Sequence, residues 1–305
     1  MIRVAIIGFG KIAADQHLPA IAADPRFELV AVATPAGDPD IGVPWYSGAA
    51  ELLAAMDGVA EAIAICTPPS ARHDLARDAL QAGFDVLLEK PPTTTLGELD
   101  ALAELARERG RVLYTAWHSQ FAPGVAPTAA LLANAEIDTL HISWREDVRK
   151  WHPGQEWIWN AGGFGVFDTG INALSILSQI VPMPLLVRAA TLSVPENRQA
   201  PIAAAIDFIG GDWRAEFDWR FDAGEEWIIR IVTQDRREIE LRDGGARLMV
   251  DGADQPLDDL GEYPQIYDRF HTLVSARACA VDRQPLRMAA DAFMVARREI
   301  VAAFP

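Results

Sequence analysis

The sequence predicts an α/β protein of two domains, a doubly wound parallel sheet followed by an α+β domain with a large, mostly antiparallel open sheet. Up to about residue 120, short apolar runs alternate with helix-like segments, a pattern typical of a parallel sheet with helices on both faces. From Leu185 to Val250, apolar and polar residues alternate with a period of two, as in an antiparallel sheet with one buried face. The length of 305 residues suits two ordinary domains, which we place at 1–120 and 121–305.

The composition limits the kinds of molecule that the protein is expected to bind. The 43 acidic residues outnumber the 27 basic ones, giving a net charge of −16, which argues against nucleic acid or an anionic membrane and favours a small neutral molecule. Two cysteines occur and no Cys/His cluster has metal-ligand spacing, so no metal is expected and Cys66 is interpreted as a buried thiol. The chain enters a strand at once, without a signal-peptide layout, and no apolar run approaches the ~18 residues of a membrane span. We therefore expect a cytoplasmic protein.

The first strand, residues 3–8, leads into Gly8-Phe9-Gly10-Lys11-Ile12-Ala13 and then a helix-like segment. This order matches the Rossmann dinucleotide fingerprint G-x-G-x-x-G/A. Gly8 permits the tight turn, Gly10 lets the backbone approach a pyrophosphate, and Ala13 lets the helix pack closely on the strand. The pattern predicts NAD or NADP bound by Gly8, Gly10, Lys11 and Ile12 at the positive end of the helix. The alternative is a glycine turn without a ligand.

The end of the second strand, residues 27–34, leaves the choice of cofactor open. NAD enzymes often carry an acidic residue there, about 20 residues after the glycines, to bind the ribose 2′-hydroxyl. Here the strand ends in Thr34-Pro35-Ala36, with neither an acid nor an arginine for a 2′-phosphate. Use of both NAD and NADP is plausible, and Thr34 is a candidate partner of the ribose.

The remaining elements of the first domain follow from local signals. Ser70 is expected to cap a helix that runs through Gln81, and Thr95 with Glu98 forms a capping box for a helix that ends at Gly110. Three strand ends should then line one crevice with the dinucleotide. These ends contribute Cys66, Thr67 and Pro68, then Glu89 and Lys90, and finally Trp117 and His118.

Lys90 has the most restrictive surroundings of these residues. It follows the apolar run Val86–Leu88 and precedes Pro91-Pro92. Because proline has no N–H, the chain must leave the sheet there, which holds Lys90 at a fixed point on the rim. The alternative is a surface lysine before a turn.

The second domain begins with a strand that ends at an unusual carboxylate. Leu140, Ile142 and Trp144 share a face, and Glu146 lies on the same face; a carboxylate there is costly unless it meets a partner or ligand. The following loop carries Trp151, His152, Trp157 and Trp159. Its aromatic rings suit either a packed core or the apolar face of a sugar ring.

The helix after Gly162-Gly163 carries a polar stripe at helical spacing, made of Asp168, Asn172, Ser175 and Gln179. We favour a pocket wall over a solvent face, because the stripe is short-chained and lacks Lys or Glu. Beyond the sheet, two helices are predicted at residues 263–278 and 285–303. The open face of such a sheet often serves as a subunit interface, so a homo-oligomer is plausible.

Taken together, these residues resemble the glucose–fructose oxidoreductase / inositol dehydrogenase family over nearly the whole chain. The resemblance rests on Gly8–Ala13, Cys66-Thr67-Pro68, Glu89-Lys90-Pro91 and 162–172. Within that family, residues 11–20, 117–119, 144–155 and 165–172 are similar to the D-galactose and L-arabinose 1-dehydrogenases.

The resemblance implies oxidation of a sugar C1 hydroxyl to a lactone, with hydride passing to NAD(P)+. It implies that Lys90, Asp168 and Asn172 contact the reacting end of the sugar. Many members have histidine where this chain has Asn172, and asparagine cannot accept a proton in that role. The acid/base work then falls on Asp168 or Lys90. Glu146, His118, His152 and Trp151 are candidate binders of the rest of the sugar.

Two other functions fit parts of the pattern. One is a sugar or cyclitol dehydrogenase acting at another ring carbon. The other is a regulator that binds a dinucleotide without catalysis, since fold does not fix function.

Overall fold

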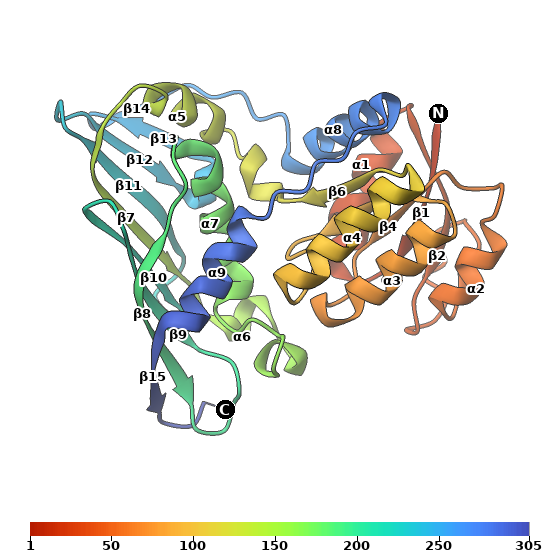
Figure 1. The fold of residues 1–305 in the computed structure, drawn as a ribbon, viewed down its shortest axis with the longest axis horizontal. Coiled ribbons are helices and arrows are strands. Elements are labelled where there is room, and N and C mark those ends of the chain that lie inside the picture. The colour runs from red at the N-terminus through yellow and green to blue at the C-terminus, as the bar shows by residue number, and fades with distance from the viewer. Residues whose placement is uncertain (305) are drawn as a thin grey trace. The chain divides into compact units, whose positions relative to one another are not determined.

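The computed structural model describes residues 1–304, which form two compact units (Figure 1). Unit 1 comprises Met1–His118 together with Glu262–Asp282. Unit 2 comprises Ser119–Gly261 and the described residues from Arg283 onward. The expected division of the chain at residue 120 therefore differs from the structure in one respect, because Glu262–Asp282 joins the first unit rather than the second.

Unit 1 is built on a six-stranded sheet whose order is β3-β2-β1-β4-β5-β6, and all five strand pairs are parallel. The strands are β1 (Ile2–Ile7), β2 (Phe27–Ala33), β3 (Trp45–Tyr46), β4 (Ala62–Ile65), β5 (Asp85–Glu89) and β6 (Leu113–Ala116). The carboxyl ends of parallel strands share one edge, so Gly8, Thr34, Thr67 and Lys90 follow four strands at the same edge, as predicted.

Helices cover both faces of this sheet. The helical elements are η1 (Ala13–His17), α1 (Leu18–Ala23), α2 (Ala49–Ala55), α3 (Pro69–Gln81), α4 (Leu96–Arg109) and, from the returning segment, α8 (Glu262–Ala276). Leucines and alanines of α2, α3 and α4 pack with alternate residues of β1, β2, β4, β5 and β6 in one apolar core. On the other face, α1 and α8 pack together, and the ring of Phe27 in β2 lies 5.1 Å from that of Tyr267 in α8.

Local signals set most helix ends. The capping box of Thr95 and Glu98 is present, and Gly110 ends α4 in the left-handed conformation, both as predicted. The cap expected at Ser70 is wrong, because α3 already begins at Pro69, with Pro68 as its N-cap. Proline suits the first helical position, where an N–H would have no partner. Cys66 is a free cysteine and only half-buried, rather than buried as expected.

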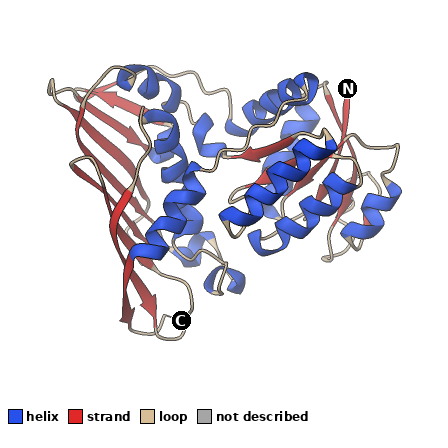
Figure 2. Cartoon of the chain, in the orientation of Figure 1, coloured by secondary structure: helices blue, strands red, loops and turns tan. Residues whose placement is uncertain are grey.

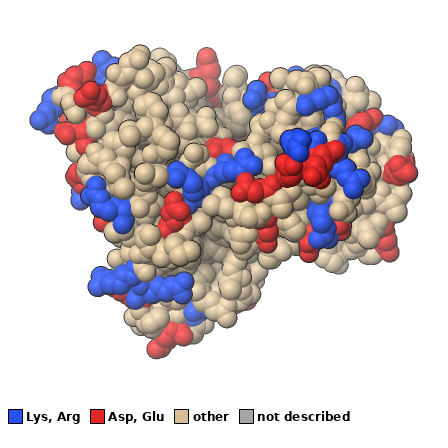
Figure 3. Space-filling model, in the orientation of Figure 1, with Lys and Arg blue, Asp and Glu red and all other residues tan. Residues whose placement is uncertain are grey.

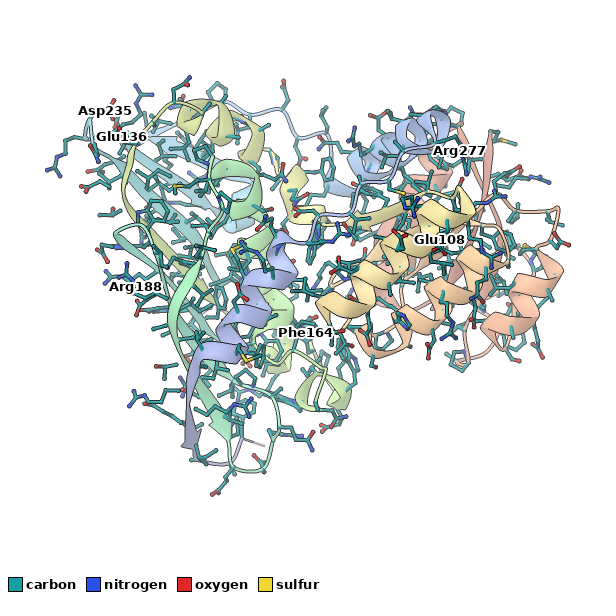
Figure 4. The ribbon with its side chains drawn as sticks, viewed as in Figure 1. Glu108, Glu136, Phe164, Arg188, Asp235 and Arg277 are labelled. Carbon is teal, nitrogen blue, oxygen red and sulfur yellow. The ribbon has the colours of Figure 1, made fainter. Side chains whose placement is uncertain are left out.

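Residues that follow α8 bind the rest of unit 1 through hydrogen bonds. Arg277, labelled in Figure 4, donates to the buried Asp85 carboxylate at 2.6 Å and to the Gly110 carbonyl at 2.6 Å. Beyond it, the Thr115 N–H donates to the Ala280 carbonyl at 3.1 Å, so this segment also contacts the edge strand β6.

Unit 2 is built on a nine-stranded sheet of order β14-β13-β12-β11-β7-β10-β9-β8-β15. The strands are β7 (Ile137–Arg145), β8 (Val187–Pro195), β9 (Ala203–Phe208), β10 (Asp212–Asp218), β11 (Glu226–Thr233), β12 (Glu238–Arg242), β13 (Arg247–Val250), β14 (Ala253–Asp254) and β15 (Ala296–Val301). Only the β7–β10 and β8–β15 pairs are parallel, so the sheet is mostly antiparallel, as predicted.

Helices lie on one side of this sheet, and the described residues place none on the other (Figure 2). The helical elements of unit 2 are η2 (His118–Phe121), α5 (Val125–Leu132), α6 (Val148–Trp151), η3 (Glu156–Trp159), α7 (Phe167–Ile180), η4 (Asp243–Gly245) and α9 (Gln284–Val295). The first residue of η2, His118, closes unit 1. Burial follows the predicted alternation in β10, where Trp213, Ala215 and Phe217 are buried and their neighbours are not.

The last predicted helix is partly wrong. Residues 285–303 were expected to be helical throughout, but α9 ends at Val295 and Ala296–Val301 forms β15. This strand pairs in parallel with β8, so hydrogen bonding to the sheet edge overrides the helix preference of its Ala, Arg and Glu residues.

No helix among the described residues is long and apolar enough to cross a membrane. Acidic and basic side chains are intermingled on the face drawn in Figure 3.

Candidate active site

The turn after β1 has the geometry that a dinucleotide requires. Gly8 adopts a φ of +92°, and a Cβ there would lie 2.7 Å from the Thr67 backbone nitrogen, so only glycine fits. A Cβ on Gly10 would meet no atom within 4 Å, which leaves that side of the turn open. Lys11 and Ile12 follow on the exposed side, and Lys11 pairs with Asp15.

Thr67 supplies a second observation at the same place. Its hydroxyl oxygen is buried and makes no hydrogen bond to another described residue, and buried polar groups ordinarily have a partner. The glycine turn and this hydroxyl, both at the carboxyl edge of the sheet, fit a nicotinamide dinucleotide. Among the residues that the structure describes, no group of three His, Cys, Asp or Glu could hold a metal ion.

Thr34 lies where the ribose contact was predicted, and it is buried. Its carbonyl accepts a hydrogen bond from the Trp45 indole at 3.0 Å, and its hydroxyl accepts the Ala36 N–H at 3.3 Å. These bonds fix the turn after β2. The contact of Thr34 with a ribose stays a prediction.

Hydrogen bonds fix the backbone at Lys90 and at the residues on either side of it. Its N–H donates to the Glu89 carboxylate at 2.8 Å. The buried Arg72 donates to the Glu89 carbonyl at 2.7 Å and also to the Pro91 carbonyl, and its Nε donates to the Thr67 carbonyl at 2.7 Å. The loops after β4 and β5 are thus tied together by one guanidinium.

Glu89, predicted to contact the cofactor, instead has its carboxylate inside unit 1, with 2% of the residue exposed. One oxygen accepts from His17 Nε2 at 3.0 Å and from the Tyr263 hydroxyl at 2.7 Å. Burial opposes the charge on Glu89, but the hydrogen bond from His17 and the nearby positive charges lower its pKa to about 2. Burial likewise opposes the charge on His17, yet Cys66, Tyr267 and the hydrogen bond with Glu89 raise its pKa well above its usual range. At neutral pH the two form a buried ion pair.

Trp117 and His118 are the last two residues that were predicted to line the crevice with the dinucleotide. The Trp117 indole is buried and donates to the Asp282 carbonyl at 3.0 Å, so it packs inside the unit. His118 is partly exposed, and its Nδ1 lies 2.6 Å from a Glu262 carboxylate oxygen. Its ring stacks on that of Tyr263, 5.8 Å away. Of the two, His118 has the more exposed side chain, and its contact with a ligand stays a prediction.

In unit 2, Glu146 is buried at the end of β7, and one of its oxygens accepts from the Trp227 indole at 2.8 Å. Trp227 stacks on Trp144 at 6.0 Å and contacts Trp151 at 5.6 Å. Trp151 is 41% exposed, so its ring keeps a free surface, whereas Trp159 is buried against Trp219. The core interpretation therefore holds for Trp159, and the sugar-binding interpretation stays a prediction for Trp151.

Asp168 lies in the first turn of α7 and is only 5% exposed. The loop before it is tightly packed, since a Cβ on Gly163 would lie 2.1 Å from the Trp157 carbonyl; Phe164 of this loop is labelled in Figure 4. His152 Nε2 lies 3.6 Å from the Asp168 carboxylate, and its ring packs on Trp219 at 5.3 Å. The structure therefore brings two predicted site residues from different segments together.

The polar stripe of α7 is only partly a pocket wall. Asn172 is half-buried one turn after Asp168. Ser175 is buried, and its hydroxyl donates to the Asn172 carbonyl at 2.7 Å, so it is satisfied within the helix. Gln179 is exposed. The predicted stripe of four residues is wrong in this respect.

Sequence reasoning missed several residues around these groups, namely His17, Arg72, Trp227, Glu262 and Tyr263. A buried arginine or histidine leaves no periodic signal. The one available sign for His17 is its place within residues 11–20, which carried part of the resemblance.

Comparisons with known proteins cover the whole chain. The chain is 45% identical over 306 residues to a galactose 1-dehydrogenase of Pseudomonas fluorescens, covering 99% of this chain and 98% of that protein. The crystal structure of a D-galactose-1-dehydrogenase from Rhizobium etli superimposes with a TM-score of 0.93 at 46% identity, covering 100% of this chain and 98% of that one. A 3-ketoreductase from Actinomadura kijaniata, solved with NADP, shares the fold at a TM-score of 0.85 and 20% identity, covering 100% of this chain and 99% of that one.

The predicted resemblance is confirmed by these relatives and by a family model that matches residues 2–117, described as an oxidoreductase family with an NAD-binding Rossmann fold. The chain belongs to this GFO_IDH_MocA family of oxidoreductases.

Proposed function

We propose that the protein is an NAD(P)-dependent aldose 1-dehydrogenase, which oxidises the C1 hydroxyl of a pyranose of the D-galactose, L-arabinose or D-fucose type to the lactone. The observation that carries the proposal is the 45% identity with a galactose 1-dehydrogenase over 98% of that protein. The similarity extends through unit 2, where most of the predicted sugar-binding residues lie.

The cofactor is assigned to the carboxyl edge of the unit 1 sheet. Bound there, NAD(P)+ supplies the hydride acceptor for the carbon that is oxidised. The chain's own contribution is a glycine turn that admits a pyrophosphate and a buried hydroxyl in need of a partner. The residues proposed to hold it are Gly8, Gly10, Lys11, Ile12, Thr34, Cys66, Thr67, Pro68, Lys90 and His118.

The acid/base roles follow from the chemistry of two side chains. An ionised carboxylate only accepts hydrogen bonds, and an ammonium group only donates them. We therefore assign proton removal from the C1 hydroxyl to Asp168, and polarisation of that oxygen to Lys90. His152, 3.6 Å from the Asp168 carboxylate, stabilises its negative charge when the imidazole is protonated. Asn172 orients the hydroxyl without exchanging a proton.

The rest of the sugar is assigned to Glu146, His118, His152 and Trp151. One Glu146 oxygen accepts a hydrogen bond from the Trp227 indole, and a carboxylate can accept further hydrogen bonds from the hydroxyl groups of a sugar. The exposed ring of Trp151 suits the C–H face of a pyranose.

Two further proposals concern the protein as a whole. We place it in the cytoplasm, consistent with its lack of a long apolar helix in the described chain. We also propose a homo-oligomer formed through the open face of the unit 2 sheet. Analytical ultracentrifugation would overturn the second proposal by finding a monomer at micromolar concentration.

A substrate screen tests the proposed function. Purified protein with NAD+ or NADP+ is offered D-galactose, L-arabinose, D-fucose and inositols, and the reduced cofactor is followed by absorbance. We expect turnover of the aldoses, with acid released as the lactone hydrolyses. Turnover of inositols alone would favour the cyclitol dehydrogenase, and no turnover at all would favour the regulator.

The roles of Asp168 and Lys90 are separable in the same assay. Asp168→Asn keeps the shape of the side chain but removes the base, and Lys90→Ala removes the ammonium group. Each is expected to lower kcat by about 100-fold or more, in the range of general acid–base catalysis. Near-native turnover in either variant would exclude that residue from its role.

A further inference from the structure

We propose that His17 and Tyr263 are positioning residues for Lys90, acting through the Glu89 carboxylate. The proposal rests on the role given to Lys90 in the proposed function. It concerns residues that lie in unit 1 and touch neither a hydride acceptor nor a sugar in the function proposed above.

The first part of the argument is the geometry beside Lys90. Glu89 has one carboxylate oxygen on the Lys90 N–H at 2.8 Å and the other on His17 and Tyr263, at 3.0 and 2.7 Å. The carboxylate therefore links the backbone of Lys90 to two side chains that come from distant parts of the sequence. Because three donors hold the Glu89 carboxylate, the rotamer of Glu89 is fixed, and its hydrogen bond in turn fixes the backbone N–H of Lys90.

The second part is the origin of His17. It ends η1, a π-helical segment with a hydrogen bond from the Leu18 N–H to the Ala13 carbonyl. Such segments are rare and are found frequently at functional sites. Here the segment directly follows the glycine turn, and it ends with His17 fully buried between Glu89 and Tyr267, whose hydroxyl lies 2.9 Å from Nδ1. The helix that opens at the dinucleotide turn is thus fastened to the Lys90 loop.

The third part is charge. A buried carboxylate and a buried imidazolium that face each other are strongly directional, since both have lost their water and keep only a few protein partners. Both groups also stay charged around neutral pH, because the pKa of Glu89 is low and the pKa of His17 is raised. This makes the assembly a rigid support, and a displacement of about 1 Å at a catalytic group can cost about 100-fold in rate.

Tyr263→Phe is the sharpest test, because it removes one donor to Glu89 and leaves the ring in place. Tyr114→Phe is its matched control, since Tyr114 is a buried tyrosine that also packs on α8, with its ring stacked on Phe270 at 6.3 Å. We expect Tyr263→Phe to lower kcat about 10-fold with KM for sugar and cofactor within two-fold, and Tyr114→Phe to leave both unchanged.

A double-mutant cycle distinguishes positioning from a general loss of structure. In a Lys90→Ala background, Tyr263→Phe should cause no further fall in the residual rate, because the group it positions is gone. An equal fall in both backgrounds, or a kcat within two-fold of the wild-type value, overturns the proposal.

Two more measurements cover the other outcomes. If Tyr263→Phe melts early, the kcat values of His17→Gln and His17→Leu are compared instead. His17→Gln retains an N–H donor and His17→Leu does not, so equal kcat values for these two variants overturn the proposal. If the wild-type protein oxidises no sugar, the proposed function fails, yet the support is still measurable by the acetylation rate of the Lys90 amine, read by peptide mass spectrometry. That rate should change at least two-fold in Tyr263→Phe alone, and an unchanged rate refutes the proposal.

Discussion

Glu89→Gln is expected to destabilise the protein by about 3 kcal/mol at pH 7. The pKa of Glu89 falls from its ordinary 4.5 to about 2 in the folded protein. That difference, at about 1.4 kcal/mol per pKa unit, gives about 3 kcal/mol of stability from the charged form. It agrees with the ~3–5 kcal/mol lost when one partner of a buried ion pair is removed. The hydrogen bond with Glu89 is also among the causes of the raised pKa of His17, so the contribution of His17 is not added.

The pH dependence has a definite sign. Because the folded pKa is depressed, the stabilisation is fully present above pH 4.5 and is lost as the pH falls toward 2. The gap between wild type and Glu89→Gln should therefore narrow to about 2 kcal/mol at pH 3.5. On the alkaline side, the raised pKa of His17 keeps the pair intact through neutral pH.

Urea unfolding at pH 7 and pH 3.5 measures both quantities, and melting at pH 7 should shift by roughly 6–12 °C. Glu104→Gln is the control, because Glu104 pairs with Arg107 on the exposed surface of α4, where an ion pair contributes little. A gap below about 1 kcal/mol at pH 7, or one that widens as the pH falls, would refute the assignment of a buried ion pair.

Three other predictions concern the two halves of the chain. Gly8→Ala should abolish NAD(P) binding in calorimetry, because its Cβ would lie 2.7 Å from the Thr67 nitrogen at a φ of +92°; unchanged affinity would contradict the assignment of this turn. Trp227→Phe removes the donor to Glu146 at 2.8 Å and should raise the KM for galactose about 10-fold, since a buried hydrogen bond to a carboxylate is worth about 1.5–3 kcal/mol. An unchanged KM would exclude Glu146 from sugar binding. Trp151→Ala should raise the sugar KM with little change in melting temperature, because the ring is 41% exposed; an early melt with normal KM would make it a core residue instead.

Much of the fold was predictable because its signals are local. The capping box at Thr95 and the left-handed Gly110 depend only on a few neighbouring residues, and both are present. The alternation in residues 213–217 likewise predicted which side chains of β10 are buried. The strand ends that carry Thr67 and Lys90 followed from short apolar runs.

The larger failures depend on partners far away in the sequence. Residues 296–301 have good helix formers, and only the free edge of β8 makes them a strand. The helix predicted at residues 263–278 is present as α8, but the sequence of a helix does not say which sheet it covers. For the same reason, the contacts of Glu89 with His17 and Tyr263, 72 and 174 residues away, had no signature in the sequence.

The return of α8 to unit 1 has a consequence for synthesis on the ribosome. Residues 1–118 emerge first, but they lack Tyr263, Tyr267 and Arg277, which contact Glu89, His17 and Asp85. Until residue 282 has left the exit tunnel, the nascent dinucleotide-binding unit carries buried charges without their full set of partners. Its completion therefore waits for nearly the whole of unit 2 to be translated, and a stop codon anywhere in unit 2 before α8 also removes a segment of unit 1.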